Sequence, residues 1–154
     1  GWAGRNGYNI MTVGHPHAPE KVRPAVEAWK QGLIEAGFDP KQKHCQFHVR
    51  THVNESDERA KEIATSAISR YDAISRIGRR SLTATPAEYD WDTMLATGRN
   101  NYGTPDQVIQ GIHNATAHYY FDTLTTTFNF GGIPHAVITK SMRLFAKEVM
   151  PALR

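Results

Sequence analysis

The chain has 154 residues, of which 40% are hydrophobic and 21% charged, and its formal net charge is +3. This length and composition are typical of one globular domain and too small for two ordinary ones. Lys and Arg alternate with Asp and Glu along the chain, whereas a nucleic-acid-binding face needs clustered basic residues. The single cysteine, Cys45, excludes an internal disulfide, and no apolar run approaches the roughly 20 residues that span a bilayer. We therefore expect a cytoplasmic protein with neither nucleic acid nor membrane as a partner.

The first third of the chain predicts a strand followed by a helix. The apolar run Tyr8–Val13 follows a glycine and precedes two prolines, which is typical of a short buried strand. Apolar residues then recur at steps of four, three and four, which places them on one face of a helix ending at Gly37: Val22, Val26, Trp29 and Leu33.

The segment Cys45–Val53 alternates with a period of two, which predicts a strand. Its odd-numbered side chains are mostly apolar, and its even-numbered ones include His48, Arg50 and His52. If the apolar face packs on helices, the polar face points into an interior that contains something polar. The alternative is that this strand lies at the edge of a sheet and its polar face contacts water.

A second helix follows, with Ser56 as its N-cap. Its apolar stripe is Ala60, Ile63, Ala64, Ala67, Tyr71 and Ile74. Residues 79–102 then break the pattern with Pro86, Gly98 and several Thr and Asn. A segment this long between elements is often a lid over a functional site, and a disordered surface insertion is the alternative.

The last third predicts helix, strand and helix. Thr104, Pro105 and Gln107 form a capping-box helix start, and the helix continues through an apolar stripe of Val108, Ile112 and Ala115. The alternating stretch Asp122–Phe130 predicts a strand. After a Gly-Gly turn comes a final helix with the stripe Ile138, Met142, Phe145 and Val149. Strands separated by helices pair in parallel, so the pattern predicts an α/β fold, either an open sheet or part of a barrel.

Ligands of parallel α/β folds bind beyond the C-terminal ends of the strands. A metal site is not expected, although His44, Cys45, His48 and His52 lie close in sequence. On a strand, His48 and His52 stand about 13 Å apart and cannot share one ion. Cys45 is interpreted as a buried structural thiol. The sequence contains no P-loop, nucleophile elbow or His-Glu-x-x-His motif.

Four stretches together resemble the bacterial luciferase-like family of flavin-dependent monooxygenases. Residues 2–7 (WAGRNG) are similar to the family's Trp-Ala-Ala-x-x-Gly segment before the sixth barrel strand, and residues 56–60 (SDERA) to the helix start after the seventh. Residues 103–108 (GTPDQV) resemble the family's Gly-Ser/Thr-Pro-Glu-x-Val helix. The most specific match is the end of the chain: residues 128–132 (FNFGG), 141–146 (SMRLFA) and 148–151 (EVMP).

The resemblance implies one partial domain over residues 1–154, the C-terminal part of a (β/α)8 TIM barrel. Strands six, seven and eight would be Tyr8–Val13, Gln46–Val53 and Asp122–Phe130, and residues 79–102 would be the lid-like insertion. It also implies FMN, or alternatively a deazaflavin, as cofactor, with reduced flavin and O2 acting on a small organic substrate. The family's catalytic and phosphate-binding residues would lie upstream of Gly1. We therefore expect this fragment alone to be inactive and to need its missing N-terminal half or another subunit, with a flavin reductase as a further partner.

Strand geometry suggests which residues would contact ligands in such a barrel. Met11, Gly14 and Asn129 would flank the flavin ring, and Arg50 and His52 would contact the substrate. Two other functions remain open. One is a non-catalytic flavin-binding or partner subunit of the same fold, and the other is a self-contained α/β binding domain.

Overall fold

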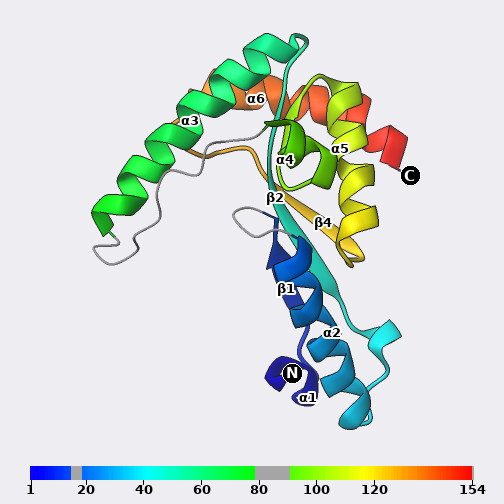
Figure 1. Ribbon diagram of the computed structural model, residues 1–154. Coiled ribbons are helices and arrows are strands. Elements are labelled where there is room, and N and C mark those ends of the chain that lie inside the picture. Colours follow the sequence, from blue (N-terminus) through cyan, green and yellow to red (C-terminus); the bar gives the residue numbers. More distant parts are fainter. Residues whose placement is uncertain (15–18, 79–90, 154) are drawn as a thin grey trace.

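The computed structural model describes residues 1–14, 19–78 and 91–153, without the side chains of residues 72, 75–78 and 91. Helices and parallel strands alternate along it (Figure 1). The elements are α1 (Trp2–Arg5), β1 (Ile10–Val13), α2 (Pro19–Glu35), η1 (Pro40–Gln42), β2 (Cys45–Val53), α3 (Asp57–Gly78), α4 (Trp91–Thr97), β3 (Asn101–Gly103), α5 (Pro105–His118), β4 (Thr123–Thr127), α6 (His135–Leu144), η2 (Phe145–Val149) and η3 (Met150–Leu153).

The sheet is built around β2, which pairs in parallel with all three other strands. β1 pairs with its first half, from Ile10 opposite Cys45, and β4 pairs along Gln46 to Arg50. The parallel arrangement expected from the sequence is confirmed. The alternative that Cys45–Val53 is an edge strand is wrong, because β1 and β4 both pair with residues 46–48 and so lie on opposite sides of β2.

Residues 91–102 differ from the sequence-based expectation of an irregular insertion, which covered residues 79–102. They form α4 and most of the short strand β3, which continues the sheet beside the end of β2 with Thr51 opposite Asn101. The described part of the sheet therefore has four strands, where the sequence predicted three. Three residues are too few to show a period of two, so no strand could be predicted there from the sequence. The predicted lid also includes residues 79–90, which lie outside the described residues.

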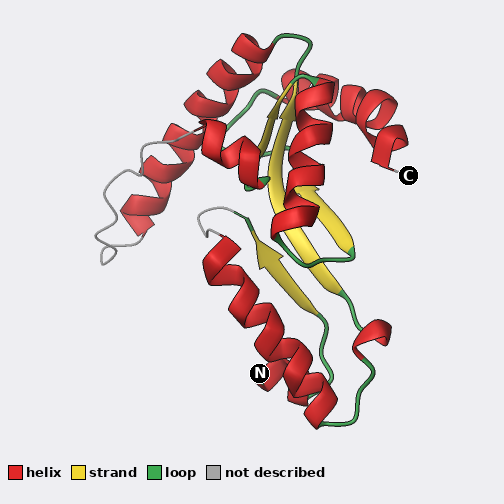
Figure 2. Ribbon diagram, turned by 45° about the vertical axis from the view of Figure 1, so that its right-hand side comes forward, coloured by secondary structure: helices red, strands yellow, loops and turns green. Residues whose placement is uncertain are grey.

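The two views show a molecule drawn out along β2 (Figures 1 and 2). α1, β1 and α2 lie around the beginning of β2, and α5 runs beside its middle. α3 and α6 lie near its end, and α3 extends away from the sheet in both views. None of the described helices is both long and apolar enough to cross a membrane.

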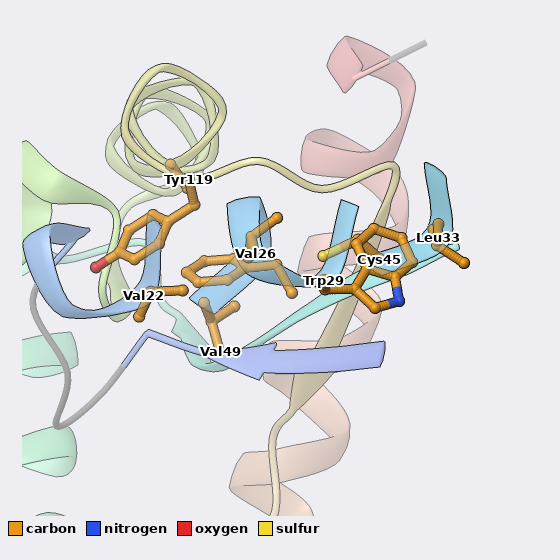
Figure 3. Packing of buried hydrophobic residues seen from close by; sticks show 9 residues of the cluster. Val22, Val26, Trp29, Leu33, Cys45, Val49 and Tyr119 are labelled. Carbon is orange, nitrogen blue, oxygen red and sulfur yellow. The ribbon is translucent and has the colours of Figure 1, made fainter. Parts of the chain in front are cut away.

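The apolar face of β2 packs on helices, as the alternation predicts. Cys45, Phe47 and Val49 are at most 1% exposed and lie against the predicted stripe of α2, where Trp29 is 2% exposed (Figure 3). The Trp29 indole Nε1 donates a hydrogen bond to the Tyr8 carbonyl at 2.8 Å, which satisfies its polar atom. Burying side chains of this size stabilises a fold by roughly 1.5–3 kcal/mol each.

A second apolar cluster joins the end of β2 to the C-terminal helices. Val53 packs against Val108 and Ile112 of α5 and against Phe145 and Val149 of η2. The capping box predicted at the start of α5 is present, with Gln107 N–H donating to Thr104 Oγ1.

One position of the last predicted stripe is wrong. Met142 is 49% exposed, and Ser141 is buried in its place. The Ser141 Oγ accepts a hydrogen bond from the Val53 backbone N–H at 2.8 Å, so α6 turns this polar side chain toward the sheet.

Candidate functional site

The face of the sheet opposite the apolar core is polar around its centre. Register places Gln46, His48 and Arg50 of β2 on this face, level with Thr123, Thr125 and Thr127 of β4. Met11 and Val13 of β1 share it on the other side. We call these eight residues the polar face. It carries no Asp or Glu, so its only full charge at neutral pH is the Arg50 guanidinium.

Side chains on the polar face bond to one another across the strands. Thr125 Oγ1 donates to Gln46 Oε1 at 3.4 Å, and Thr127 Oγ1 lies 3.3 Å from His48 Nε2. Such contacts fix the orientation of hydroxyl and amide groups along β4. The resulting surface offers both hydrogen-bond donors and acceptors.

Arg50 lies near the C-terminal end of this face and is half-buried. Its guanidinium carbon is 4.2 Å from the ring centroid of Tyr71 in α3 and 6.0 Å from that of Phe130, which follows β4. Stacking on aromatic rings stabilises a guanidinium and leaves its N–H edges free. Arg50 also influences His48, because burial and then the charge of Arg50 lower the pKa of that imidazole.

His52 comes two residues later on the same side of β2 and is only 1% exposed. Within the described part of the chain, neither of its ring nitrogens has a hydrogen-bond partner. Burial lowers its pKa to about 4, so the imidazole is neutral at pH 7. Its register partner is Tyr102 of β3, and α3 contacts both of these strands. A ligand reaches His52 only if the covering segments move, and its role in substrate binding stays a prediction.

The three residues expected to flank a cofactor are placed differently from one another. Met11 is 60% exposed on the polar face, and Asn129 is exposed after β4. Gly14 is buried, and a Cβ added there would lie 2.6 Å from the Arg99 carbonyl oxygen and 2.9 Å from Phe47 Cζ. Packing alone therefore requires glycine at position 14. Their cofactor contacts stay predictions.

Sequence reasoning missed the aromatic side chains beside Arg50. Tyr71 and Ile74 were assigned to the apolar stripe of their helix, yet Tyr71 is 39% exposed and Ile74 is 68% exposed. The Tyr71 ring instead covers the guanidinium of Arg50 on β2. No local pattern in the sequence indicated this contact.

No family model matches the sequence, and no curated protein matches it. Solved structures do match its fold. Monooxygenase RslO1 from Streptomyces bottropensis has a TM-score of 0.79 and 22% identity, over 99% of this chain and 44% of that one. The oxygenating constituent of 3,6-diketocamphane monooxygenase from Pseudomonas putida, a type II Baeyer-Villiger monooxygenase in complex with FMN, has a TM-score of 0.66 and 20% identity, over 98% and 44%. An F420-dependent secondary alcohol dehydrogenase, in complex with an F420-acetone adduct, has a TM-score of 0.61 and 19% identity, over 99% and 45%.

This chain thus has the fold of part of these oxidoreductases, and it spans less than half the length of each of the three. The parallel α/β sheet predicted from the sequence agrees with them.

Proposed function

We propose that this chain forms the C-terminal part of the barrel of a luciferase-like oxidoreductase that uses FMN, or alternatively deazaflavin F420. β1, β2 and β4 would be barrel strands six, seven and eight, and the reaction would be the oxygenation of a small organic substrate by reduced flavin and O2. The observation that carries the proposal is the match of nearly the whole chain to structures of two monooxygenases and an F420-dependent dehydrogenase.

The residues of the polar face fit such a cofactor. Hydroxyl and amide groups of Thr125, Thr127 and Gln46 can hydrogen-bond a flavin ring or its phosphate-bearing chain, and no carboxylate on the face repels an anion. Met11, Gly14 and Asn129 would flank the ring, and Arg50 and His52 would contact the substrate. When bound, the flavin supplies the redox chemistry, while these side chains hold and orient the reactants and limit access of water.

Further strands are needed to complete the surface. Among the described residues, β1 and β4 each pair only with β2, which leaves an unpaired strand edge on either side of the sheet. Unpaired edges and an open inner face favour association with another polypeptide segment. We propose that the rest of the barrel, or another subunit, covers these edges and the inner face. This chain alone would then be inactive, and a flavin reductase would supply reduced FMN to the assembled protein.

Cofactor binding tests the proposal directly. FMN and F420 are titrated separately into the purified protein, and binding is followed by the change in their fluorescence. Replacing Met11 with Ala is expected to weaken binding several-fold, because this side chain lies open on the polar face. Met142→Ala is the matched control, since Met142 has similar exposure on α6.

Turnover is then measured on the protein assembled with the rest of the barrel or its partner subunit, with an oxygen electrode and FMN reduced by an added flavin reductase. Oxygen uptake that yields an oxygenated product supports the monooxygenase. Binding of F420 with reduction by an alcohol assigns the deazaflavin alternative, and binding without turnover assigns the non-catalytic subunit. Failure of the assembled protein to bind either cofactor would contradict the proposal and favour a self-contained binding domain.

A further inference from the structure

Arg50 is a charged side chain that has no counter-charge among the described residues. Its Nη1 is buried, and the described residues provide it with no hydrogen-bond acceptor and no carboxylate within ion-pair distance. Its guanidinium contacts the rings of Tyr71 and Phe130. A guanidinium has five N–H donors and stays protonated in proteins, so this arrangement leaves strong donors unused.

Ring stacking does not replace the missing acceptor. A cation–π contact contributes about 0.5–2 kcal/mol, whereas leaving a buried charged donor unsatisfied costs more than that. Burial also makes any anion that does arrive bind more strongly, because water no longer screens the pair. Among the described residues, the guanidinium therefore lacks a negatively charged acceptor.

The surroundings determine what kind of acceptor fits. Tyr71 and Phe130 hold the guanidinium from α3 and from the end of β4, which limits its freedom before binding. Thr127 lies opposite Arg50 in register and brings a hydroxyl to the same place, and the polar face brings no competing carboxylate. Arginine forks match the two oxygens of a carboxylate or phosphate.

We propose that Arg50, held by Tyr71 and Phe130, is the binding site for an oxyanion group, a carboxylate or a phosphate, carried by the ligand of this protein. The inference rests on the proposed function only in deciding whether the substrate or the cofactor carries that group. Binding of the oxyanion itself is independent of any redox activity.

The test uses cofactor-free purified protein and two simple probes, sodium benzoate and inorganic phosphate. Binding is measured by isothermal titration calorimetry at constant ionic strength in a buffer that contains neither group. We expect at least one probe to bind, with affinity at least tenfold weaker in Arg50→Gln. Arg50→Lys keeps the charge but loses the fork and is expected to be intermediate. Arg143→Gln, an exposed arginine of α6, is the matched control and should bind like the wild type.

Three results would overturn the site: neither probe binds, Arg50→Gln binds as tightly as the wild type, or Arg143→Gln is weakened equally. If a carboxylate from another polypeptide segment already pairs with Arg50, neither probe will bind. In that case Arg50→Gln will also reduce the stability of the protein. Circular dichroism checks that each variant is folded, and the Lys variant keeps the test valid if Gln does not fold.

A last comparison identifies the carrier of the group. The titration is repeated with protein saturated with FMN. Retained binding of the probe assigns the oxyanion to the substrate, and loss of binding assigns it to the phosphate of the cofactor. If FMN does not bind at all, the proposed function fails while the oxyanion site stands on the cofactor-free titration.

Discussion

Ser141 Oγ accepts a hydrogen bond at 2.8 Å from the backbone N–H of Val53, the last residue of β2, 88 positions earlier in the chain. Both residues are 1% exposed, so no water replaces this contact. It anchors α6 to the C-terminal end of the sheet, next to the polar face.

Ser141→Ala is therefore expected to reduce the free energy of unfolding by about 1–3 kcal/mol, because the Val53 N–H is left buried without an acceptor. Chemical denaturation followed by circular dichroism measures the change. Ser69→Ala, at an exposed position of α3, is the control and should change stability by less than about 0.5 kcal/mol. Equal effects of the two substitutions would argue against the anchoring role.

The adjacent glycines after β4 provide a second, closely matched pair. Both have positive φ, +56° at Gly131 and +69° at Gly132. A Cβ added at Gly131 would lie 1.8 Å from the Ala67 carbonyl oxygen. A Cβ added at Gly132 would have Arg70 Nε, at 3.8 Å, as its nearest neighbouring atom. Gly132→Ala should cost only the left-handed backbone strain, about 1–2 kcal/mol.

Gly131→Ala adds a steric clash to the same strain and should cost several kilocalories per mole more, or prevent folding. Thermal unfolding of the two variants, compared in one buffer, separates these contributions. The close packing of the two segments at Gly131 would be doubtful if both variants melted at the same temperature.

Protonation of His52 links stability to pH. Burial lowers the pKa of His52 to about 4 in the folded protein, while an unfolded histidine has a pKa near 6.5. The unfolded state therefore binds more protons between these values. This contribution to stability is complete above about pH 6.5 and is lost as pH falls toward 4, with a slope of up to about 1.4 kcal/mol per pH unit.

His52→Leu removes the group that titrates and should flatten that part of the stability profile, measured by urea denaturation from pH 4 to 8. The exposed His113 of α5 is the control position, and His113→Leu should leave the profile unchanged. An identical slope in wild type and His52→Leu would assign the pH dependence to other groups.

The thiol of Cys45 should be chemically inert while the protein is folded. The side chain is fully buried and its Sγ donates to the Tyr120 carbonyl at 3.3 Å. Burial, and then the nearby charge of Asp122, raises the pKa of Cys45 to about 11, and only the thiolate is reactive. A chromogenic disulfide reagent should react at least a hundredfold more slowly with native than with urea-unfolded protein. As the chain has one cysteine, the signal has a single source. Rapid reaction of the native protein would show that this region opens readily.

The sequence predicted those elements whose pattern repeats several times. The nine residues of Cys45–Val53 alternate long enough to show both the strand and its two faces, and Trp29 stands in a helical stripe that packs on one of them. β3 was not predictable, because Asn101–Gly103 is a strand only through its pairing with the end of β2. Tertiary contacts, rather than local propensity, define so short a segment.

The candidate site was predictable only in its strand residues. The alternation placed His48 and Arg50 on one face, but it contained no information on what lies over them. The contact between Arg50 and Tyr71 depends on where α3 passes the sheet, and the exchange of Ser141 for Met142 depends on how α6 is rotated. The Arg50–Tyr71 contact and the burial of Ser141 rather than Met142 are both set by packing between distant segments, which a local sequence pattern does not predict.

The pairing scheme of β2 also limits how this chain can vary. Within the described residues, β1, β3 and β4 are each bonded to β2, so the same nine-residue segment sets the alignment of all three. An inserted or deleted residue in β2 would turn every following side chain of the strand to the opposite face. Arginine and histidine would then point into the hydrophobic core, and phenylalanine and valine would point away from it. Insertions and deletions should therefore accumulate in the connecting loops, while this segment keeps its length.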